Sequence, residues 1–430
     1  MRLHAIVASL IIVSIAVAEP WPQWRGPTGD SVVREAVVPL KWSETENVVW
    51  KCSLPDGAST PAVWGDAIFL TGADGEKLTA YRIDARAGTV VWSKIFANGT
   101  PRREPVRGLP GGPRAEQRFH KLHNLASPSP TTDGKLVIWH FGTGDLVATD
   151  FDGKELWRHD MQKEYGRYTI WWGHSNSPVL YGDLVISVCM QDSLADVDGA
   201  EVANSYLVAH DKASGAERWK TPRMTPAQKE HCDSYTTPVF RTVNGKTELI
   251  VVGAEQIDAY DPATGKRLWY LPDFVGNRTI TGPTLIADVL IATKGMRGEA
   301  VGLKLGGIGE LSQDAIRWRL KKGTPDTPCP VAANGLAFFV SDNGIATCVD
   351  VLTGDVRWEE RLKGDFKASP ITAQGRVYFL NLTGKCTVVR AANKFEVLAE
   401  NAVEDETIAS LAASDGALYV RGRKALYKVR

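Results

Sequence analysis

The sequence predicts an all-β fold, an eight-bladed β-propeller, because two short phrases recur in step along the chain and the two chain ends complement each other. The first phrase is an Asp, a turn that closes with Gly, and a Trp four residues after that Gly. Units of about four short strands that return roughly every 40–45 residues are typical of propeller blades. The copies are Asp84-Gly88-Trp92, Asp211-Gly215-Trp219, Asp261-Gly265-Trp269, Asp350-Gly354-Trp358 and a shorter Asp150-Gly153-Trp157.

The second phrase is a Ser/Thr-Pro or similar dipeptide that precedes each copy of the first. An apolar run, a turn and a β-branched or aromatic stretch such as Leu184-Val-Ile-Ser187 follow it, which predicts short strands and leaves no room for long helices. The dipeptides are Thr60-Pro61, Ser127-Pro128, Ser177-Pro178, Thr237-Pro238, Gly282-Pro283, Cys329-Pro330 and Ser369-Pro370, with Ser410-Leu411 as a degenerate eighth.

Each residue type in the first phrase has a structural reason to be there. Gly permits a positive φ in a tight turn, and Asp can accept backbone N–H groups in that turn. Trp offers a large apolar plate with one N–H donor, which suits a wedge between neighbouring blades. We therefore predict structural docking roles, and no catalytic role, for Trp50, Trp92, Trp157, Trp219, Trp269, Trp318 and Trp358.

The chain ends predict how the ring closes. The last repeat, residues 414–429, stops before any outer strand with a Trp, and residues 46–51 near the N-terminus carry the missing strand around Trp50. An N-terminal strand in the last blade removes both free edges of the ring. This count gives eight blades. Seven blades plus a misassigned repeat is the alternative, because the fifth repeat is poorly kept around Gly302 and Leu398 takes the Trp position in the seventh.

The N-terminal residues predict export. Residues 1–18 have the pattern of a signal peptide, with an apolar run from Ala5 to Val17 and an Ala-x-Ala site that ends at Ala18. The run is short for a membrane span, and no cysteine follows it for lipid attachment. We predict an arm over 19–45 that packs on the propeller, then a single propeller over 46–430 with insertions near 98–124 and 191–204. The expected location is periplasmic or secreted, and the expected state is a monomer without a membrane span.

Composition limits the partners. Lys plus Arg and Asp plus Glu both number 50, so nothing favours nucleic acid or an anionic membrane. Six scattered cysteines leave two interpretations open. Disulfides are permitted in an oxidising compartment, with Cys348 and Cys386 as possible neighbours, and buried free thiols are the other interpretation.

A ligand should bind where the loops that enter the innermost strands converge on the axis. These loops gather histidines, aromatics and polar residues. His120 and His123 with His174 or His231 could ligate a metal, or they could hydrogen-bond to backbone; we predict no metal site. Arg278 and Asp326 lie in further loops. The candidate ligand-binding residues are His120, His123, Asn124, Tyr168, Trp171, Trp172, His174, Asn176, His231, Asp233, Tyr235 and Lys367.

The repeated Asp-to-Trp phrase resembles the tryptophan-docking motif of the quinoprotein-type β-propellers. That superfamily includes pyrroloquinoline-quinone alcohol dehydrogenases and the non-enzymatic propeller subunit of the outer-membrane protein assembly machinery. Residues Trp21 to Pro27 also resemble the start of exported bacterial PQQ-like repeat proteins. If the chain is similar to the dehydrogenases of this superfamily, the resemblance implies a quinone that lies in the funnel on a Trp floor, beneath a disulfide between adjacent cysteines. It also implies a Ca²⁺ ion bound by carboxylate and amide oxygens, and an Asp that acts as the catalytic base. This chain has no adjacent cysteines.

Three hypotheses follow. The leading one is an exported, non-catalytic propeller that binds a protein or peptide partner, or a ligand, with no cofactor. The alternative is a quinoprotein dehydrogenase that uses pyrroloquinoline quinone and Ca²⁺. A second alternative is a funnel that binds or hydrolyses saccharides, served by the histidine and aromatic loops. No nucleophile–base motif supports any other chemistry.

Overall fold

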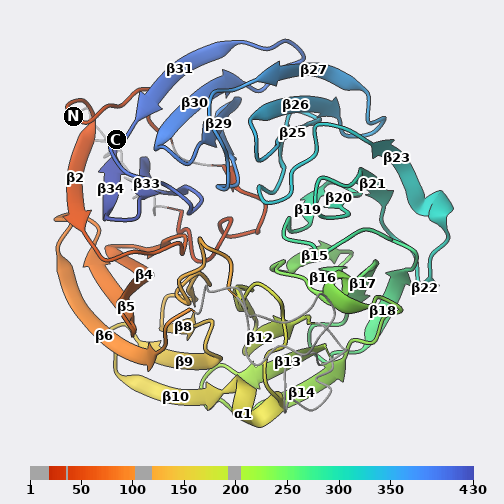
Figure 1. Ribbon diagram of the computed structural model, residues 1–430, viewed down its shortest axis with the longest axis horizontal. Helices are drawn as coiled ribbons and strands as arrows, with labels where there is room; N and C mark the ends of the chain where they lie inside the picture. The colour runs from red at the N-terminus through yellow and green to blue at the C-terminus, as the bar shows by residue number, and fades with distance from the viewer. Residues whose placement is uncertain (1–18, 35–36, 102–118, 192–204) are drawn as a thin grey trace, which may run out of the picture.

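Eight four-stranded antiparallel units surround a central axis in the computed structural model, which describes residues 19–34, 37–101, 119–191 and 205–430 (Figure 1). This confirms the all-β, eight-bladed prediction and rules out seven blades. The predicted signal peptide and the centres of both predicted insertions lie outside the described residues. Within the described part of the chain, none of the helices is long and apolar enough to cross a membrane.

Each blade runs from an innermost strand at the axis to an outermost strand on the rim. Taken in that order, the first four blades are β3 (Ala62–Trp64), β4 (Ala67–Asp74), β5 (Lys77–Asp84), β6 (Val90–Asn98); β7 (Thr131–Thr132), β8 (Leu136–His140), β9 (Asp145–Asp150), β10 (Glu155–Asp160); β11 (Val179–Tyr181), β12 (Leu184–Cys189), β13 (Tyr206–Asp211), β14 (Glu217–Pro222); and β15 (Val239–Val243), β16 (Lys246–Gly253), β17 (Gln256–Tyr260), β18 (Arg267–Leu271).

The remaining blades follow the same order. They are β19 (Thr284–Ile286), β20 (Val289–Thr293), β21 (Ala300–Lys304), β23 (Ile316–Leu320); β24 (Val331–Ala333), β25 (Leu336–Val340), β26 (Ile345–Asp350), β27 (Val356–Arg361); β28 (Ile371–Ala373), β29 (Arg376–Leu380), β30 (Lys385–Arg390), β31 (Val397–Ala402); and β32 (Ala412–Ser414), β33 (Ala417–Arg421), β34 (Ala425–Val429), β2 (Val48–Ser53). Short extra elements are β1 (Val32–Val33), α1 (Met161–Tyr165), η1 (Lys229–Cys232), β22 (Gly309–Glu310) and η2 (Gln313–Ala315).

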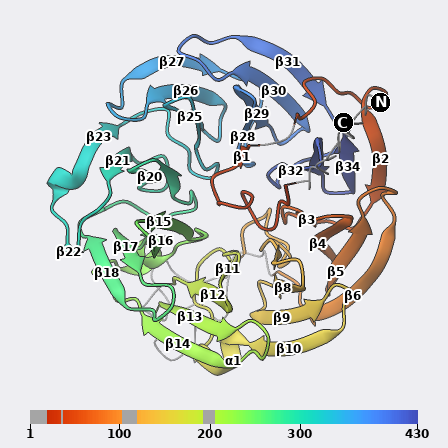
Figure 2. The same cartoon turned by 180° about the vertical axis from the view of Figure 1, so that it is seen from behind.

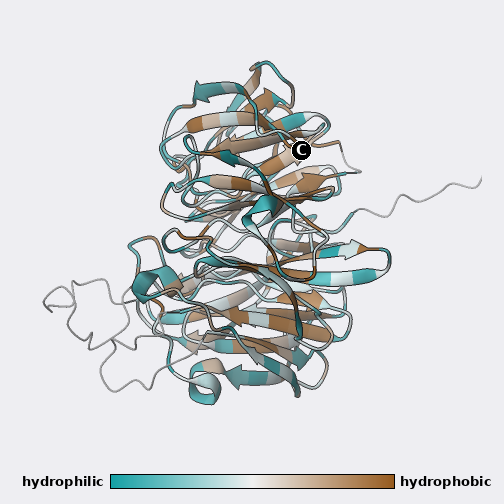
Figure 3. Cartoon of the chain, turned by 90° about the vertical axis from the view of Figure 1, so that its right-hand side faces the viewer, coloured by the Kyte–Doolittle hydropathy of each residue, from teal (hydrophilic) through white to brown (hydrophobic). Residues whose placement is uncertain are grey.

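The ring closes as predicted. β2 pairs antiparallel with β34, from Val48 opposite Val429 to Ser53 opposite Ala425, so the last blade combines both ends of the chain. In Figure 1, β2 lies beside β34 at this blade. The hydrophobic core lies between blades, since large apolar clusters combine the facing strands of neighbouring blades. Figure 3 shows hydrophobic residues along many of these strands.

The repeated tryptophans dock each blade onto the next. In six of the eight junctions the indole Nε1–H donates to a backbone carbonyl in the turn of the following blade. The acceptors are Ala85 for Trp50 (3.2 Å), Phe151 for Trp92 (2.9 Å), Lys212 for Trp157 (2.9 Å), Pro262 for Trp219 (3.1 Å), Val351 for Trp318 (2.7 Å) and Ala392 for Trp358 (2.9 Å).

The Gly and Asp of the phrase build that docking turn. Gly88 has φ of +71°, and a Cβ added there would lie 2.5 Å from the Trp50 ring, so only a residue without a side chain lets the indole settle on the turn. Asp84 accepts the backbone N–H groups of Arg86 and Ala87 through Oδ1 (2.8 and 2.7 Å). The whole phrase is therefore a device for joining blades.

One docking tryptophan has no acceptor. The fifth blade lacks the Asp–Gly turn, and β22 instead adds a parallel strand to the outer edge of β18, with Trp269 opposite Gly309. Trp269 is buried, and its Nε1 has no hydrogen-bond partner among the residues that the structure describes.

The Ser/Thr-Pro phrase forms a second set of links, around the axis. In six of the eight junctions the backbone N–H of the residue before Pro donates to the side chain of the equivalent residue in the next blade. The links are Thr60 to Ser129 (2.9 Å), Ser129 to Ser177 (3.0 Å), Ser177 to Thr237 (3.1 Å), Gly282 to the thiol of Cys329 (3.0 Å), Cys329 to Ser369 (2.9 Å) and Ser369 to Ser410 (3.0 Å).

These links correct one sequence assignment. The second blade contributes Ser129-Pro130, and the predicted Ser127-Pro128 lies in the loop ahead of it, because Ser129 is the residue that bonds to both neighbouring blades. The series is interrupted at Gly282, which has no side chain to accept the N–H of Thr237.

The N-terminal segment crosses one face of the ring (Figure 2). Trp21 exchanges backbone hydrogen bonds with Val63 in the first blade, and β1 pairs parallel with β28 in the seventh. Arg25 is 1% exposed, and its guanidinium donates to the carbonyls of Pro283 (2.8 Å) and Pro330 (3.0 Å), in the fifth and sixth blades. The segment therefore ties distant blades together across the axis.

The cysteines are all buried free thiols. No disulfide joins Cys348 to Cys386, so the second interpretation of the cysteines is the correct one. Burial raises the pKa of Cys348 to about 12, as expected for small apolar side chains that take no part in chemistry.

The missing acceptor at Trp269 gives a testable contrast. Trp318→Phe removes an indole that donates to Val351 and leaves that carbonyl unpaired, whereas Trp269→Phe removes a buried donor that has no partner. We expect Trp318→Phe to lower the free energy of unfolding by about 1 kcal/mol more than Trp269→Phe does. Urea unfolding of the two variants measures the difference, and equal losses would show that the Nε1 bonds contribute nothing to docking.

Candidate functional site

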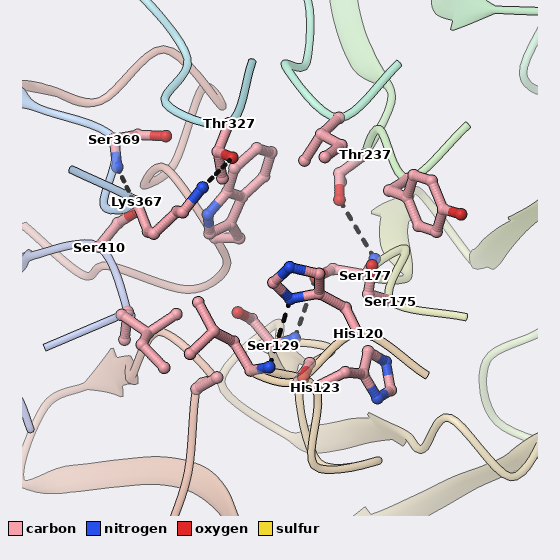
Figure 4. Close-up of a pocket in the computed structure, with 18 of the residues that line it drawn as sticks. His120, His123, Ser129, Ser175, Ser177, Thr237, Thr327, Lys367, Ser369 and Ser410 are labelled. Carbon is pink, nitrogen blue, oxygen red and sulfur yellow. Dashed lines mark hydrogen bonds between the residues drawn. The ribbon is translucent and has the colours of Figure 1, made fainter. Parts of the chain in front are cut away.

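A cavity of about 250 Å³ opens at the axis where the loops that enter the innermost strands meet (Figure 4). All eight blades contribute to it, and it lies at the axis, where the sequence analysis places a candidate ligand site. The lining residues are Trp24, Ala58, Thr60, His120, Leu122, His123, Ser127, Ser129, Trp172, Gly173, Ser175, Ser177, Tyr235, Thr237, Arg278, Ile280, Asp326, Thr327, Lys367, Ser369, Ile408, Ala409 and Ser410.

Five of the predicted site residues line this funnel: His120, His123, Trp172, Tyr235 and Lys367. The His120 ring lies in the middle of the cavity in Figure 4. Its Nδ1 accepts the backbone N–H of the neighbouring Leu122 (3.3 Å), and the ring packs edge-on against Trp172 with centroids 6.0 Å apart.

His123 is a backbone-bonding histidine. It is 7% exposed, its Nδ1 accepts the N–H of Leu125 (3.1 Å), and its Nε2 lies 2.9 Å from the carbonyl oxygen of His174. A carbonyl only accepts, so Nε2 carries the hydrogen and the ring is the neutral Nε2–H tautomer. Both ring nitrogens are engaged, which favours the backbone-bonding alternative over a metal ligand.

The other seven predicted residues lie outside the lining, and three of them organise the loops. Asn124 accepts the N–H of Ala126 (3.1 Å), and Asn176 donates to the carbonyls of Ser234 (3.2 Å) and Thr236 (2.7 Å). Asp233 is fully buried and accepts the N–H of Trp171 (2.7 Å). Trp171 and His231 lie nearby, where the His231 imidazole is 2.8 Å from the carboxylate of Glu255.

Tyr168 and His174 belong to a buried aromatic group beneath the funnel. The His174 ring stacks on Tyr168 with centroids 4.7 Å apart and lies 4.5 Å from the ring of His140. Neither nitrogen of His174 has a hydrogen-bond partner among the described residues. The structure therefore does not gather the four histidines of the sequence hypothesis into one set of metal ligands within the described ranges.

The charged groups at the funnel are paired with one another. Both Nη atoms of Arg278 donate to the carboxylate of Asp326 (3.3 Å each), and its Nε forms an ion pair with Glu230 (3.3 Å). Lys367 donates to Asp342 (2.6 Å). Burial acts to raise the pKa of Asp342, but Lys367 outweighs it and holds that pKa below its usual value, so the carboxylate stays ionised beside the ammonium.

Sequence analysis missed Trp24. This side chain lines the funnel and also a second cavity of about 290 Å³ on the side of the N-terminal segment, so its indole separates the two. A Cβ added to Gly282 would lie 3.4 Å from the Trp24 ring. Trp24 precedes the first repeat, so the repeat pattern gives no information about it. The one sequence signal that includes Trp24 is the Trp21–Pro27 motif.

The comparisons with known proteins agree with this architecture. A family model described as "Outer membrane protein assembly factor BamB" matches residues 36–201, 142–308 and 306–419, which is most of the chain. The chain belongs to this family. A comparison with curated protein sequences gives no match.

Solved structures with the same fold include members of both branches of the superfamily. BamB from Moraxella catarrhalis is similar with a TM-score of 0.59 at 13% identity, over 89% of this chain and 99% of that one. Quinohemoprotein alcohol dehydrogenase from Comamonas testosteroni is similar with a TM-score of 0.64 at 13% identity, over 95% and 80%. A europium-containing methanol dehydrogenase gives 0.62 at 12%, over 95% and 90%. At these identities the likeness establishes the fold alone.

The buried histidines predict how stability changes with pH. Burial lowers the pKa of His140 to about 3, helped by His210, and burial, with smaller electrostatic contributions from His140 and His123, lowers the pKa of His174 well below 6.5. The unfolded chain therefore binds more protons than the native protein below pH 6.5. Stability is full above that pH and falls as the pH drops towards 3.

His174→Phe should make this decline shallower, by up to about 1.4 kcal/mol per pH unit, because one titrating group is removed. Urea unfolding between pH 7 and pH 4 measures the slope. Tyr168→Phe is the matched control: it alters the ring that packs on His174, but the pKa of that phenol is raised well above 10 and it does not titrate in this range. Equal slopes in the wild type and His174→Phe would contradict the prediction.

Proposed function

We propose that this protein is an exported, non-catalytic binding propeller, and that its funnel holds an uncharged polyhydroxylated ring such as a sugar unit. The observation that carries the proposal is the composition of the funnel wall. Aromatic faces from Trp24, Trp172 and Tyr235 stand among the hydroxyl groups of the axial links. Aromatic plates pack on the apolar face of a ring while hydroxyl and charged groups bond its edges.

The charges around the funnel support an uncharged ligand. Arg278 and Lys367 are each held by carboxylates, from Asp326 and Glu230 in the first case and Asp342 in the second. A strongly charged ligand would have to break one of these pairs, which costs free energy. Paired groups can still donate and accept additional hydrogen bonds, as sugar hydroxyls require.

The funnel wall does not fit pyrroloquinoline quinone with Ca²⁺. Trp24 could serve as the Trp floor. A Ca²⁺ ion would need a carboxylate, however, and both oxygens of Asp326, the carboxylate among the described lining residues, already accept hydrogen bonds from Arg278. A guanidinium bound in this way occupies the place that a cation would need. Among the residues that the structure describes, the lining also contains no side-chain amide, and no two cysteines are adjacent in the sequence. We therefore derive no redox step for this site.

Export is part of the same proposal. The signal-like start of the chain supports it, as does membership of the family whose model is described as an outer membrane protein assembly factor.

The absence of a catalytic role is also part of the proposal. Among the described residues, the funnel contains paired charges and hydrogen-bonded histidines, a set of groups suited to holding a ligand.

Binding of simple sugars tests the funnel directly. We expect calorimetry to detect saturable binding of glucose, N-acetylglucosamine or a disaccharide to the purified protein, and Trp172→Ala to weaken it at least tenfold. Trp219→Ala removes a rim tryptophan of the docking series and is the control that should retain affinity. Absence of binding to every sugar, or binding of pyrroloquinoline quinone with Ca²⁺ followed by alcohol-dependent dye reduction, would overturn the proposal.

A second candidate function is capture of a partner polypeptide on the rim. β6 is a nine-residue outermost strand, and Val91 and Ile95 on it are 51% and 50% exposed. An exposed apolar edge strand is a template for an added strand from another chain. The pairing of β22 with the outer edge of β18 shows that this rim accepts an extra strand.

The rim candidate has its own test. Val91→Lys with Ile95→Lys should leave thermal unfolding unchanged and abolish any complex that the wild type forms in extracts of the exported compartment, seen as a shift in native electrophoresis. Val356→Lys, on the outermost strand β27 and 50% exposed, is the matched control. A complex that survives the double substitution would exclude β6 as its site.

A further inference from the structure

Two histidines and a glutamate meet on the rim between the second and third blades, away from the funnel. His159 lies on β10, Glu164 in helix α1 directly after it, and His210 on β13 of the next blade. The two imidazole rings stack with centroids 4.4 Å apart and planes at 29°. One potential ligand atom from each of the three residues lies within 4.8 Å of the other two, the one such group in the described part of the chain.

The hydrogen bonds of His159 fix which nitrogen is available. Nε2 lies 2.8 Å from the carbonyl oxygen of Gly215, which can only accept, so Nε2 carries a hydrogen. Nδ1 is then left facing Oε2 of Glu164 at 2.8 Å. Two lone pairs cannot face each other at this distance, so the pair requires either a proton on Nδ1 or a cation bound to both atoms.

A second chain of hydrogen bonds orients His210. The Tyr165 hydroxyl lies 2.7 Å from Oε2 of Glu217 and 3.0 Å from Nε2 of His210. Its single hydrogen goes to the carboxylate, so Nε2–H of His210 donates to the hydroxyl oxygen. The lone pair is therefore on Nδ1.

That lone pair has no protein partner. His210 is fully buried, and its Nδ1 has no hydrogen-bond partner among the described residues. Leaving a buried acceptor unsatisfied costs about 1–3 kcal/mol, and such an atom in a native fold calls for a ligand, a water or an ion.

We propose that Nδ1 of His159, Nδ1 of His210 and the carboxylate of Glu164 bind a divalent transition-metal ion, with Zn²⁺ the best match to two imidazoles and one carboxylate. In metal sites the ligating histidine donates its other ring N–H to an oxygen, and both histidines do so here, to Gly215 and to Tyr165. The His159 and Glu164 side chains are 19% and 37% exposed, which leaves room for water as a fourth ligand.

Such an ion would act at a blade junction. The carbonyl of Gly215 accepts the hydrogen bond from His159, and the same turn packs against the docking indole of Trp157. A Cβ added to Gly215 would lie 2.8 Å from Cγ of that indole. Metal binding would thus join β10 and α1 to β13 where the second blade docks on the third. Bound metal would raise the unfolding temperature of the native protein.

The test uses the full-length protein after removal of metal with a chelator. Co²⁺ and Zn²⁺ are the probes: we expect one equivalent of Co²⁺ to give visible d–d absorption, Zn²⁺ to displace it, and Zn²⁺ to raise the unfolding temperature. Glu164→Gln and His159→Gln should weaken binding at least 100-fold. Tyr165→Phe should weaken it about 10-fold, because it removes only the orientation of His210.

His231→Gln is the matched control. That imidazole also lies 2.8 Å from a carboxylate, Glu255, but belongs to no group of three ligands in the described residues, so its loss should leave affinity unchanged. Glu164 is on the surface, so its variant tests the site even where a change at buried His210 prevents folding. Absence of stoichiometric Co²⁺ binding, or binding that survives both Glu164→Gln and His159→Gln, would overturn the proposal.

Discussion

The pairing of β2 with β34 is the interaction on which the rest of this molecule depends. Without it the last blade would have three strands, and the ring would end in two unpaired edges. Closure also fixes where the preceding residues can go. The chain before β2 crosses one face of the ring, where Trp24 lines both the funnel and the second cavity. The same N-terminal stretch of chain therefore supplies both the closing strand and a wall of the funnel.

The blades are joined by two concentric sets of hydrogen bonds, each present at six of the eight junctions, and the junction of the fourth and fifth blades is the one that lacks both. The outer set lacks its acceptor at Trp269, and the inner set lacks its hydroxyl at Gly282, so the fourth and fifth blades are joined by neither. Other contacts lie at or beside this junction. The Arg25 guanidinium bonds to Pro283 and to Thr284 Oγ1 of the fifth blade, next to the gap, and β22 adds a strand across the outer edge. The weakest repeat in the sequence is thus where non-repeating parts of the chain are attached.

The sequence predicted the parts of this protein that repeat. The docking indoles, their Asp–Gly turns and the closing strand could be found because each appears many times or completes a missing copy. Features without a copy were harder. Ser127-Pro128 and Ser129-Pro130 are adjacent dipeptides of the same kind, and only the bonds to Thr60 and Ser177 distinguish them. Within an irregular loop, neighbours such as His123 and Asn124 face different ways, so the sequence located the funnel loops without separating lining residues from supporting ones. His159 and His210 meet only because two blades dock.

The two sites proposed here differ in how their polar groups are satisfied, and that difference determines what each can bind. At the funnel, Arg278, Lys367 and His123 already have protein partners, so a ligand gains little from charge and must be selected by shape, stacking and additional hydrogen bonds. At the rim, the lone pair of His210 Nδ1 has no partner in the described part of the chain. Nδ1 of His159 faces the Glu164 carboxylate, and this contact requires a proton or a cation between the two atoms. Unsatisfied lone pairs in a fixed arrangement select a metal ion, because coordination satisfies all of them at once.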